Sequence, residues 1–184
     1  MNQRGSSKKI ILQPFSAEDT MENSQISALI SNDGYSLEIV FELTARLAVL
    51  KIPEFDPSKS ERKDNLWEHT CFEIFLAQKG KPDYLEFNIS PSGDWNVYCF
   101  SGYRKGMKQE DSFKTLPVEV KILSDQKLKL KISIDAGVFK NFSGIDVGLS
   151  AVIERRNGGK SYWAVSHPGV IPDFHGREGW VNSL

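Results

Sequence analysis

Alternation of apolar and polar side chains at every second position is the main pattern along this chain. In YSLEIVFEL, residues 35–43, the side chains of Leu37, Ile39 and Phe41 fall on one side and two glutamates on the other. This period of two is typical of a β-strand with one buried and one solvent-facing side. Similar composition and alternation predict further strands over residues 45–52, 66–76, 84–90, 95–100, 118–123, 127–134, 146–154 and 161–166.

Residues that favour turns separate these strands at short intervals. Asn157-Gly158-Gly159, for example, suits a tight turn between the last two strands. Only residues 135–142 suggest a short helical turn. We therefore predict an all-β fold, an antiparallel β-sandwich of two packed sheets of jelly-roll or immunoglobulin-like type. At 184 residues the chain fits one domain, 1–184, with an N-terminal strand or arm over about 1–25 and a core over about 26–180.

Charge and hydropathy exclude several classes of partner. The chain has 23 Lys and Arg against 24 Asp and Glu, a net charge of −1 that offers no basic footprint for nucleic acid or an anionic membrane. No apolar run approaches the roughly 20 residues of a membrane span. Near the start, Ile10-Ile11-Leu12 is too short for the apolar region of a signal peptide. We expect a cytoplasmic protein with no nucleic-acid or membrane partner.

Common catalytic and metal-binding motifs are absent from the sequence. Two cysteines are too few for a four-thiolate zinc site, and the three histidines lack the HExxH spacing of a zinc-binding helix. Phosphate-binding GxxxxGK[ST], dinucleotide-binding GxGxxG and nucleophile-elbow GxSxG motifs are missing as well. We therefore expect no metal site and no catalytic residues.

The predicted pairing of strands gathers polar and aromatic side chains on one face. A hairpin across the turn 91–94 pairs the strands 84–90 and 95–100 so that Glu86 faces Cys99. We expect the strand over residues 66–76 to pair with the other edge of the strand 84–90. The face away from the core then carries these side chains: Trp67, His69, Glu73, Glu86, Asn88 and Trp95. Polar groups flanked by aromatic rings suit a sugar, whose C–H face stacks on rings while its hydroxyls need fixed partners.

Glu73 and Glu86 lie directly opposite each other in this predicted sheet. Two such carboxylates repel unless a proton or a cation lies between them. Arg155 or Arg156 is the candidate cation, and parity alone does not decide which of the two points inward. The favoured interpretation of the two glutamates is a structural cluster in which they form hydrogen bonds with an arginine. A catalytic pair for glycoside hydrolysis and a calcium site are less favoured interpretations.

The remaining aromatic, histidine and cysteine residues have simpler expected roles. Tyr162, Trp163 and Trp180 are expected to pack in the core or at the terminus. His167 and His175 bracket a proline-rich loop and are expected to be solvent-exposed. Cys71 and Cys99 lie two strands apart, beyond disulfide reach, and are expected to be reduced.

Three stretches resemble a known superfamily: LWEHTCFEIFLA, YLEFNISPSGDWNVYCFSGYRKGM, and DVGLSAVIE with SYWAVSHPGVIPDFH. They resemble the DOMON-like superfamily, which is similar to family-nine carbohydrate-binding modules, and are most similar to its small stand-alone bacterial members of unknown function. The resemblance covers about residues 35–180. It implies a β-sandwich that binds a ligand on a sheet face or at the strand ends, a sugar in some branches and haem in others.

The resemblance also implies roles for individual residues. Glu73 matches the acidic residue on one strand of the modules, and Tyr84, Glu86 and Phe87 match the strand that follows. Sugar-binding members clamp a terminal sugar ring between two tryptophans. Here the candidates for that pair are Trp67, Trp95 and Trp163. Haem-binding members use an axial methionine and histidine, for which the candidates are Met107 and His167.

Together these observations predict a non-catalytic domain that binds a small ligand, above all a carbohydrate, by tryptophan stacking and hydrogen bonds. The predicted ligand-binding residues are Trp67, Glu73, Glu86, Asn88, Trp95, Arg155 and Trp163. No cofactor is expected in this reading. Three alternatives stay open: a haem or redox module using Met107 and His167, a protein-interaction domain, and, least favoured, a glycoside hydrolase using the two glutamates.

Overall fold

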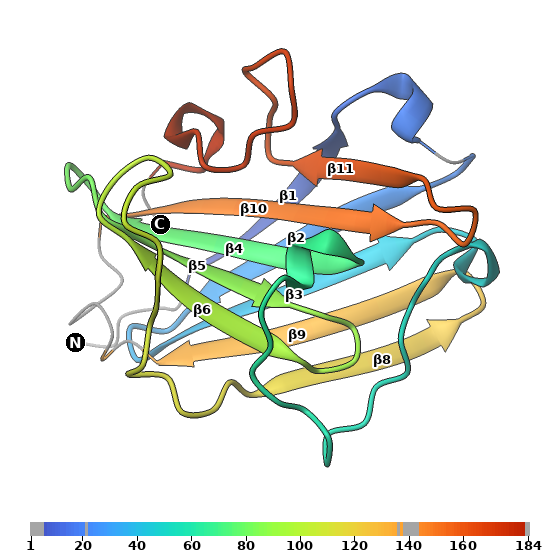
Figure 1. Ribbon diagram of the computed structural model, residues 1–184, viewed down its shortest axis with the longest axis horizontal. Helices are drawn as coiled ribbons and strands as arrows, with labels where there is room; N and C mark the ends of the chain where they lie inside the picture. The colour runs from blue at the N-terminus through green and yellow to red at the C-terminus, as the bar shows by residue number, and fades with distance from the viewer. Residues whose placement is uncertain (1–5, 21, 136, 138–143, 183–184) are drawn as a thin grey trace.

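The computed structural model describes residues 6–20, 22–135, 137 and 144–182, and these form an antiparallel β-structure with short 3-10 turns (Figure 1). In the described residues the strands are β1 (Ser6–Pro14), β2 (Gln25–Asn32), β3 (Ser36–Thr44), β4 (Cys71–Gln78), β5 (Tyr84–Ile89), β6 (Trp95–Phe100), β7 (Lys108–Gln109), β8 (Val118–Ser124), β9 (Lys127–Asp135), β10 (Ile145–Glu154) and β11 (Lys160–Ala164). None of the described helices is long and apolar enough to span a membrane.

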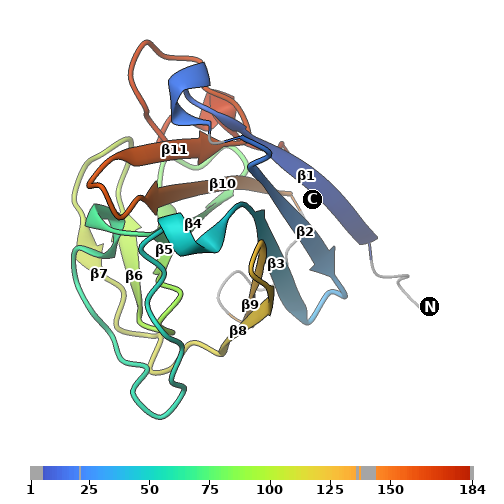
Figure 2. The same cartoon turned by 90° about the vertical axis from the view of Figure 1, so that its right-hand side faces the viewer.

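Hydrogen bonds join the described strands into one 11-stranded sheet in the order β7-β6-β5-β4-β10-β11-β1-β2-β3-β9-β8. The sheet curls, so that the half containing β3, β9 and β8 faces the half containing β4, β5 and β6 (Figure 2). β1 links the halves, since it pairs with β2 along 6–12 and with β11 at Gln13 and Pro14. The prediction of an all-β antiparallel fold is confirmed, whereas two separate sheets are not confirmed because of this link.

The apolar core fills the inside of the curl. Buried side chains of β2, β3 and β9 pack there against those of β4, β5, β6 and β10, and the rings of Phe41 and Phe72 meet across it at 5.1 Å. The alternating burial of β3 shows that its outer side is open. β10, by contrast, is buried at every position, which means that its outer side is covered as well.

Two of the predicted strand segments are wrong. Residues 45–52 contain a 3-10 turn, Leu47–Val49, because the Leu47 amide bonds to the carbonyl of Asp125 in the turn between β8 and β9. Residues 66–70 do not belong to β4: Leu66–Glu68 form another 3-10 turn, η3, which follows Asn65 in a left-handed conformation.

Two described strands precede residue 35, and a strand or arm was predicted for the first of them. β1 lies in the predicted N-terminal arm, and its Leu12 is buried in the core. β2 was not predicted, although its Ile26, Ala28 and Ile30 alternate. The helical turn predicted over 135–142 lies outside the described residues except for Asp135 and Gly137.

Candidate functional site

Two neighbouring strands direct acidic side chains to the outer side of the curled sheet, away from the core. Glu73 of β4 lies opposite Asn88 of β5, and Phe75 lies opposite Glu86. The two glutamates are therefore diagonal neighbours on one face. The prediction that they lie directly opposite each other is wrong by two positions, because β4 continues to Gln78 before the chain turns.

A cavity of about 480 Å³ lies over this face, and we call it the carboxylate cavity. Strands β4, β5, β6, β10 and β11 form its floor, and the η3 turn, the loop after β6 and the C-terminal segment form its walls. Its lining residues are Trp67, Glu68, Glu73, Glu86, Phe100, Arg104, Met107, Val152, Lys160, Tyr162, Pro172, Phe174 and His175.

The C-terminal segment is anchored to the sheet through Trp180. A Cβ atom on Gly148 of β10 would lie 2.7 Å from the Trp180 Nε1 atom, so only glycine allows the indole to approach this closely. The indole ring lies 5.5 Å from that of Phe75, and its Nε1 donates a 2.9 Å hydrogen bond to the Phe174 carbonyl. This anchor fixes Phe174 and the adjacent His175 beside the cavity. The predicted packing role of Trp180 is confirmed.

Glu73 is 3% exposed at the floor of the cavity. Its Oε2 accepts a 2.8 Å hydrogen bond from the Ser150 hydroxyl of β10. Burial and then the charge of Glu86 raise the pKa of Glu73 to about 8, against the smaller opposing effects of the Ser150 bond and of Arg104. Burial and the neighbouring carboxylate therefore favour the protonated form of Glu73.

Glu86 is 5% exposed, and a hydrogen bond from Asn88 of the same strand holds its carboxyl group. Its Oε1 accepts a 2.7 Å hydrogen bond from Asn88 Nδ2, and the Asn88 Oδ1 lies 3.6 Å from the buried Cys71 thiol. Burial raises the pKa of Glu86 to about 7, while the Asn88 bond and the charge of Arg104 act in the opposite direction. A pair with these pKa values holds at least one proton near neutral pH.

A hydrogen-bonded chain places His175 beside this pair. The Arg104 amide donates to the Tyr84 hydroxyl at 3.2 Å, so that hydroxyl has its proton free for His175 Nδ1, 2.7 Å away. Burial and then the charge of Arg104 lower the pKa of His175 to about 4, so the ring is neutral at pH 7. Its proton is then on Nε2, 3.9 Å from Glu86 Oε2. The prediction that His175 is solvent-exposed is wrong.

Trp95 is not on this face. It lies opposite Ile89 and is buried in the core, with the guanidinium of Arg62 4.4 Å from its ring. The predicted register is wrong by one residue, because Gly93, with φ of 95°, ends the loop after three residues and lets Ser90 bond to Asp94. A shift of one residue moves every side chain of a strand to the other face.

Three other predicted ligand residues do not line the cavity: Asn88, which donates a hydrogen bond to Glu86, Trp163 and Arg155. Trp163 is buried in the core, where its Nε1 donates to the Ser161 hydroxyl at 3.0 Å. Arg155 lies in the turn after β10 and points to the Glu18 carbonyl at 3.4 Å, and Arg156 bonds to that of Ala48. Neither arginine is among the residues that line the carboxylate cavity, since both belong to the turn between β10 and β11.

Of the predicted aromatic and haem-ligand candidates, Trp67 and Met107 line the cavity. Trp67 packs edge-on against Tyr98 at 5.7 Å. His167 does not line it: its Nε2 donates to the Gln13 carbonyl at 2.9 Å, and its ring packs on Phe15. The structure therefore does not bring Met107 and His167 together around this cavity.

Sequence reasoning missed several lining residues. Tyr162 and Lys160 alternate with the buried Trp163 on β11, and Phe100 shares its parity with Glu86 once the hairpin register is corrected. A three-residue loop ending in glycine was the available signal for that register. Arg104 lies in a loop, where periodicity gives no orientation.

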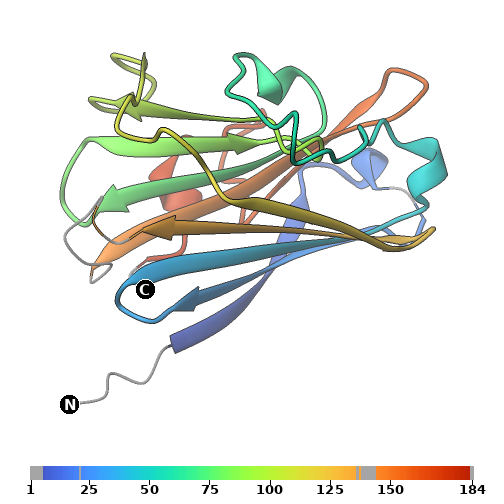
Figure 3. The same cartoon turned by 90° about the horizontal axis from the view of Figure 1, so that it is seen from below.

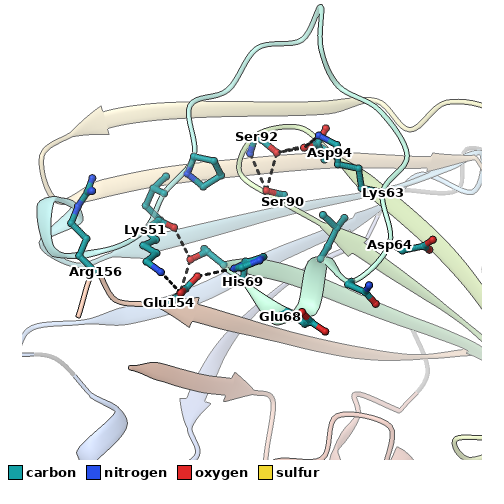
Figure 4. Close-up of a pocket in the computed structure, with 15 residues that line it drawn as sticks. Lys51, Lys63, Asp64, Glu68, His69, Ser90, Ser92, Asp94, Glu154 and Arg156 are labelled. Carbon is teal, nitrogen blue, oxygen red and sulfur yellow. Dashed lines mark hydrogen bonds and ion pairs between the residues drawn. The ribbon is translucent and has the colours of Figure 1, made fainter. Parts of the chain in front are cut away.

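A second hollow of about 560 Å³ lies beside the start of β4 and the end of β10, and we call it the Glu154 pocket (Figure 4). The Glu154 carboxylate forms an ion pair with the Lys51 ammonium and accepts a 2.9 Å hydrogen bond from His69 Nδ1. The bond from Lys51, and then that from His69, lowers the pKa of Glu154, more than burial raises it. His69, predicted on the face of the glutamate pair, is part of this ion cluster instead.

No protein-family model matches the sequence, and no curated protein matches it either. Solved structures do match. A proposed carbohydrate-binding protein from Bacteroides uniformis has a TM-score of 0.63 and 13% sequence identity, with 94% of this chain and 85% of that chain covered. A family-nine carbohydrate-binding module from Caldicellulosiruptor kristjanssonii, in complex with cellotriose, has a TM-score of 0.52 and 13% identity, with 95% and 77% covered. At this identity the likeness shows a shared fold, which is that of the family-nine modules.

Proposed function

We propose that this chain is a non-catalytic carbohydrate-binding domain and that the sugar occupies the carboxylate cavity. The observation that carries the proposal is the pair of buried glutamates at its floor. In the described residues each carboxyl uses one oxygen in a hydrogen bond to the protein, Oε2 of Glu73 and Oε1 of Glu86. Their other oxygens have no hydrogen-bond partner there, and sugar hydroxyls are suitable partners.

The aromatic side chains of the cavity support the same ligand class. Trp67, Tyr162 and Phe174 are half-buried around it, and flat rings suit the C–H face of a sugar. In this proposal Trp67 stacks on the ring, while Glu73, Glu86 and Lys160 bond to hydroxyls. Trp95, Trp163 and Arg155 have no part in it.

Isothermal titration against a panel that includes glucose and cellotriose tests the proposal. We expect saturable binding that Glu86→Gln and Trp67→Ala each weaken by about tenfold or more, since each removes about 1.5 kcal/mol or more of direct contact. Tyr35→Ala is the matched control, because Tyr35 is an exposed aromatic residue in the turn between β2 and β3. Binding that the cavity variants leave unchanged, or no binding to any sugar of a broad panel, would contradict the proposal.

We further propose that the domain is DOMON-like in descent, acts in the cytoplasm, and uses no cofactor. An absorbance scan of the purified protein tests the haem alternative through Met107 and His167, since bound haem gives a Soret band. Assays with aryl glycosides test the hydrolase alternative, in which Glu73 and Glu86 act as a catalytic pair. A Soret band or turnover lost in Glu86→Gln would replace the present proposal.

A further inference from the structure

β8 is the last strand in the order of the sheet, so one side of its backbone pairs with no other described strand (Figure 3 views the molecule from below, where this strand lies). Residues 118–122 pair regularly with β9, and a bulge at Leu123 interrupts the ladder before Ser124. Ile122 and Leu123 are 58% and 51% exposed. An edge strand with exposed apolar residues is a template for pairing with another chain.

The charges of this strand are incompletely matched within one chain. Lys121 lies directly opposite Lys129 of β9, and like charges at opposite positions destabilise a sheet. Lys129 has Glu42 as an ion-pair partner at 3.3 Å, whereas the nearest acid to Lys121 is Glu119 of its own strand at 3.8 Å. A further carboxylate beside Lys121 would therefore be stabilising.

A second copy of β8 supplies that carboxylate in one register only. A two-fold axis that relates two antiparallel copies of a strand passes through a residue that pairs with its own copy. Centring on Glu119 or on Lys121 places like charges opposite each other. Centring the axis on Val118 would bring Pro117 into the pairing, and Pro117 has no N–H group to donate. Centring it on Ile122 would bring in the bulge at Leu123, which interrupts the regular ladder. Centring on Val120 pairs Glu119 with Lys121 of the second copy, twice, and uses just the regular residues 118–122.

We propose that the β8 edge is a homodimer interface in which two copies pair antiparallel about Val120. The pairing continues the curled sheet across the two-fold axis. It places Ile122 of each copy against Val118 of the other and so covers part of the exposed apolar edge. The carboxylate cavity lies over β4, β5 and β10, in the other half of the sheet, so the dimer leaves both cavities open.

Sedimentation velocity over a concentration series measures the dimer. A five-residue edge buries little surface, so we expect a dissociation constant in the range of about 10–1000 µM. Lys121→Glu should weaken the dimer by about tenfold, because both cross-copy pairs become repulsive. The same change places a glutamate opposite Lys129, which favours the folded monomer. The double variant Glu119→Lys/Lys121→Glu should restore dimerisation.

Lys79→Glu is the matched control, since it makes the same change of charge at an exposed turn after β4. A chain that stays monomeric up to about 1 mM contradicts the interface. So does a dimer that Lys121→Glu and Lys79→Glu affect equally, or one that the double variant fails to restore.

Discussion

The carboxylate cavity and the Glu154 pocket both contain buried glutamates, yet the pKa values of these groups are shifted in opposite directions. Glu154 has Lys51 and His69 as partners, which lower its pKa. Glu73 and Glu86 have one hydrogen bond each and share the weaker influence of Arg104, so burial raises the pKa of both. Burial alone therefore does not decide the direction of the pKa shift of a glutamate, and the balance between burial and charged partners does.

The two hollows also differ in how they are covered. The C-terminal segment, anchored by Trp180, closes one side of the carboxylate cavity. The lining of the Glu154 pocket comes instead from segments 51–53, 63–70 and 90–94 and from the end of β10. A change at the Trp180 anchor should therefore affect one hollow and leave the other intact.

The largest expected effect is that of Gly148→Ala. The added methyl group occupies the position of the Trp180 indole, so the C-terminal segment must shift. We expect a loss of about 2 kcal/mol of unfolding free energy, which lowers the thermal midpoint by about 4–8 °C, together with weaker sugar binding. Differential scanning calorimetry measures the midpoint. Gly102→Ala is the control, because its Cβ meets nothing within 4 Å. Equal effects of the two variants would contradict the anchor.

The pH dependence of stability gives the next largest effect. The pKa values of Glu73 and Glu86 lie above that of a free glutamate, so the unfolded chain releases these protons first. Their stabilising contribution is complete below about pH 4.5 and is lost as the pH rises through 7 and 8. We expect Glu73→Gln to raise the thermal midpoint by about 4 °C relative to the native chain at pH 9 and by much less at pH 5.

Thermal melts across this pH range measure the difference between the two proteins. Glu68→Gln serves as the control, since Glu68 also lines the cavity but belongs to a more exposed turn. A midpoint difference for Glu73→Gln that is the same at pH 5 and pH 9 would show that the native carboxyl is not held protonated.

The smallest effect is expected in the Glu154 pocket, with the opposite dependence on pH. The lowered pKa of Glu154 gives stability that is present above about pH 4.5 and is lost as the pH falls through the folded-state value. Glu154→Gln should cost about 1 kcal/mol at pH 7, because Lys51 and His69 are largely exposed, and less at pH 3.5. Denaturant unfolding at the two pH values measures this. A larger cost at the lower pH would contradict the ion cluster.

Period-two alternation predicts much of this fold correctly, for a physical reason. Alternate side chains of a strand must face opposite sides, so the parity of Leu37, Ile39 and Phe41 assigns them to the core without any knowledge of their neighbours. Parity fails where the chain bends. Residues 45–52 are rich in strand-forming side chains, but the bond from Leu47 to Asp125 makes them a turn.

For the candidate site, parity within a strand places Glu73 on one face of its strand and puts Glu86 and Asn88 together on one face of the next strand. Contacts between distant segments account for the other features of the site. The length of the loop that ends at Gly93 moved Trp95 into the core, and the fold of the C-terminal segment brought His175 to the glutamates. Protonation of the pair follows from burial and neighbouring charge, which exist only once distant segments have come together.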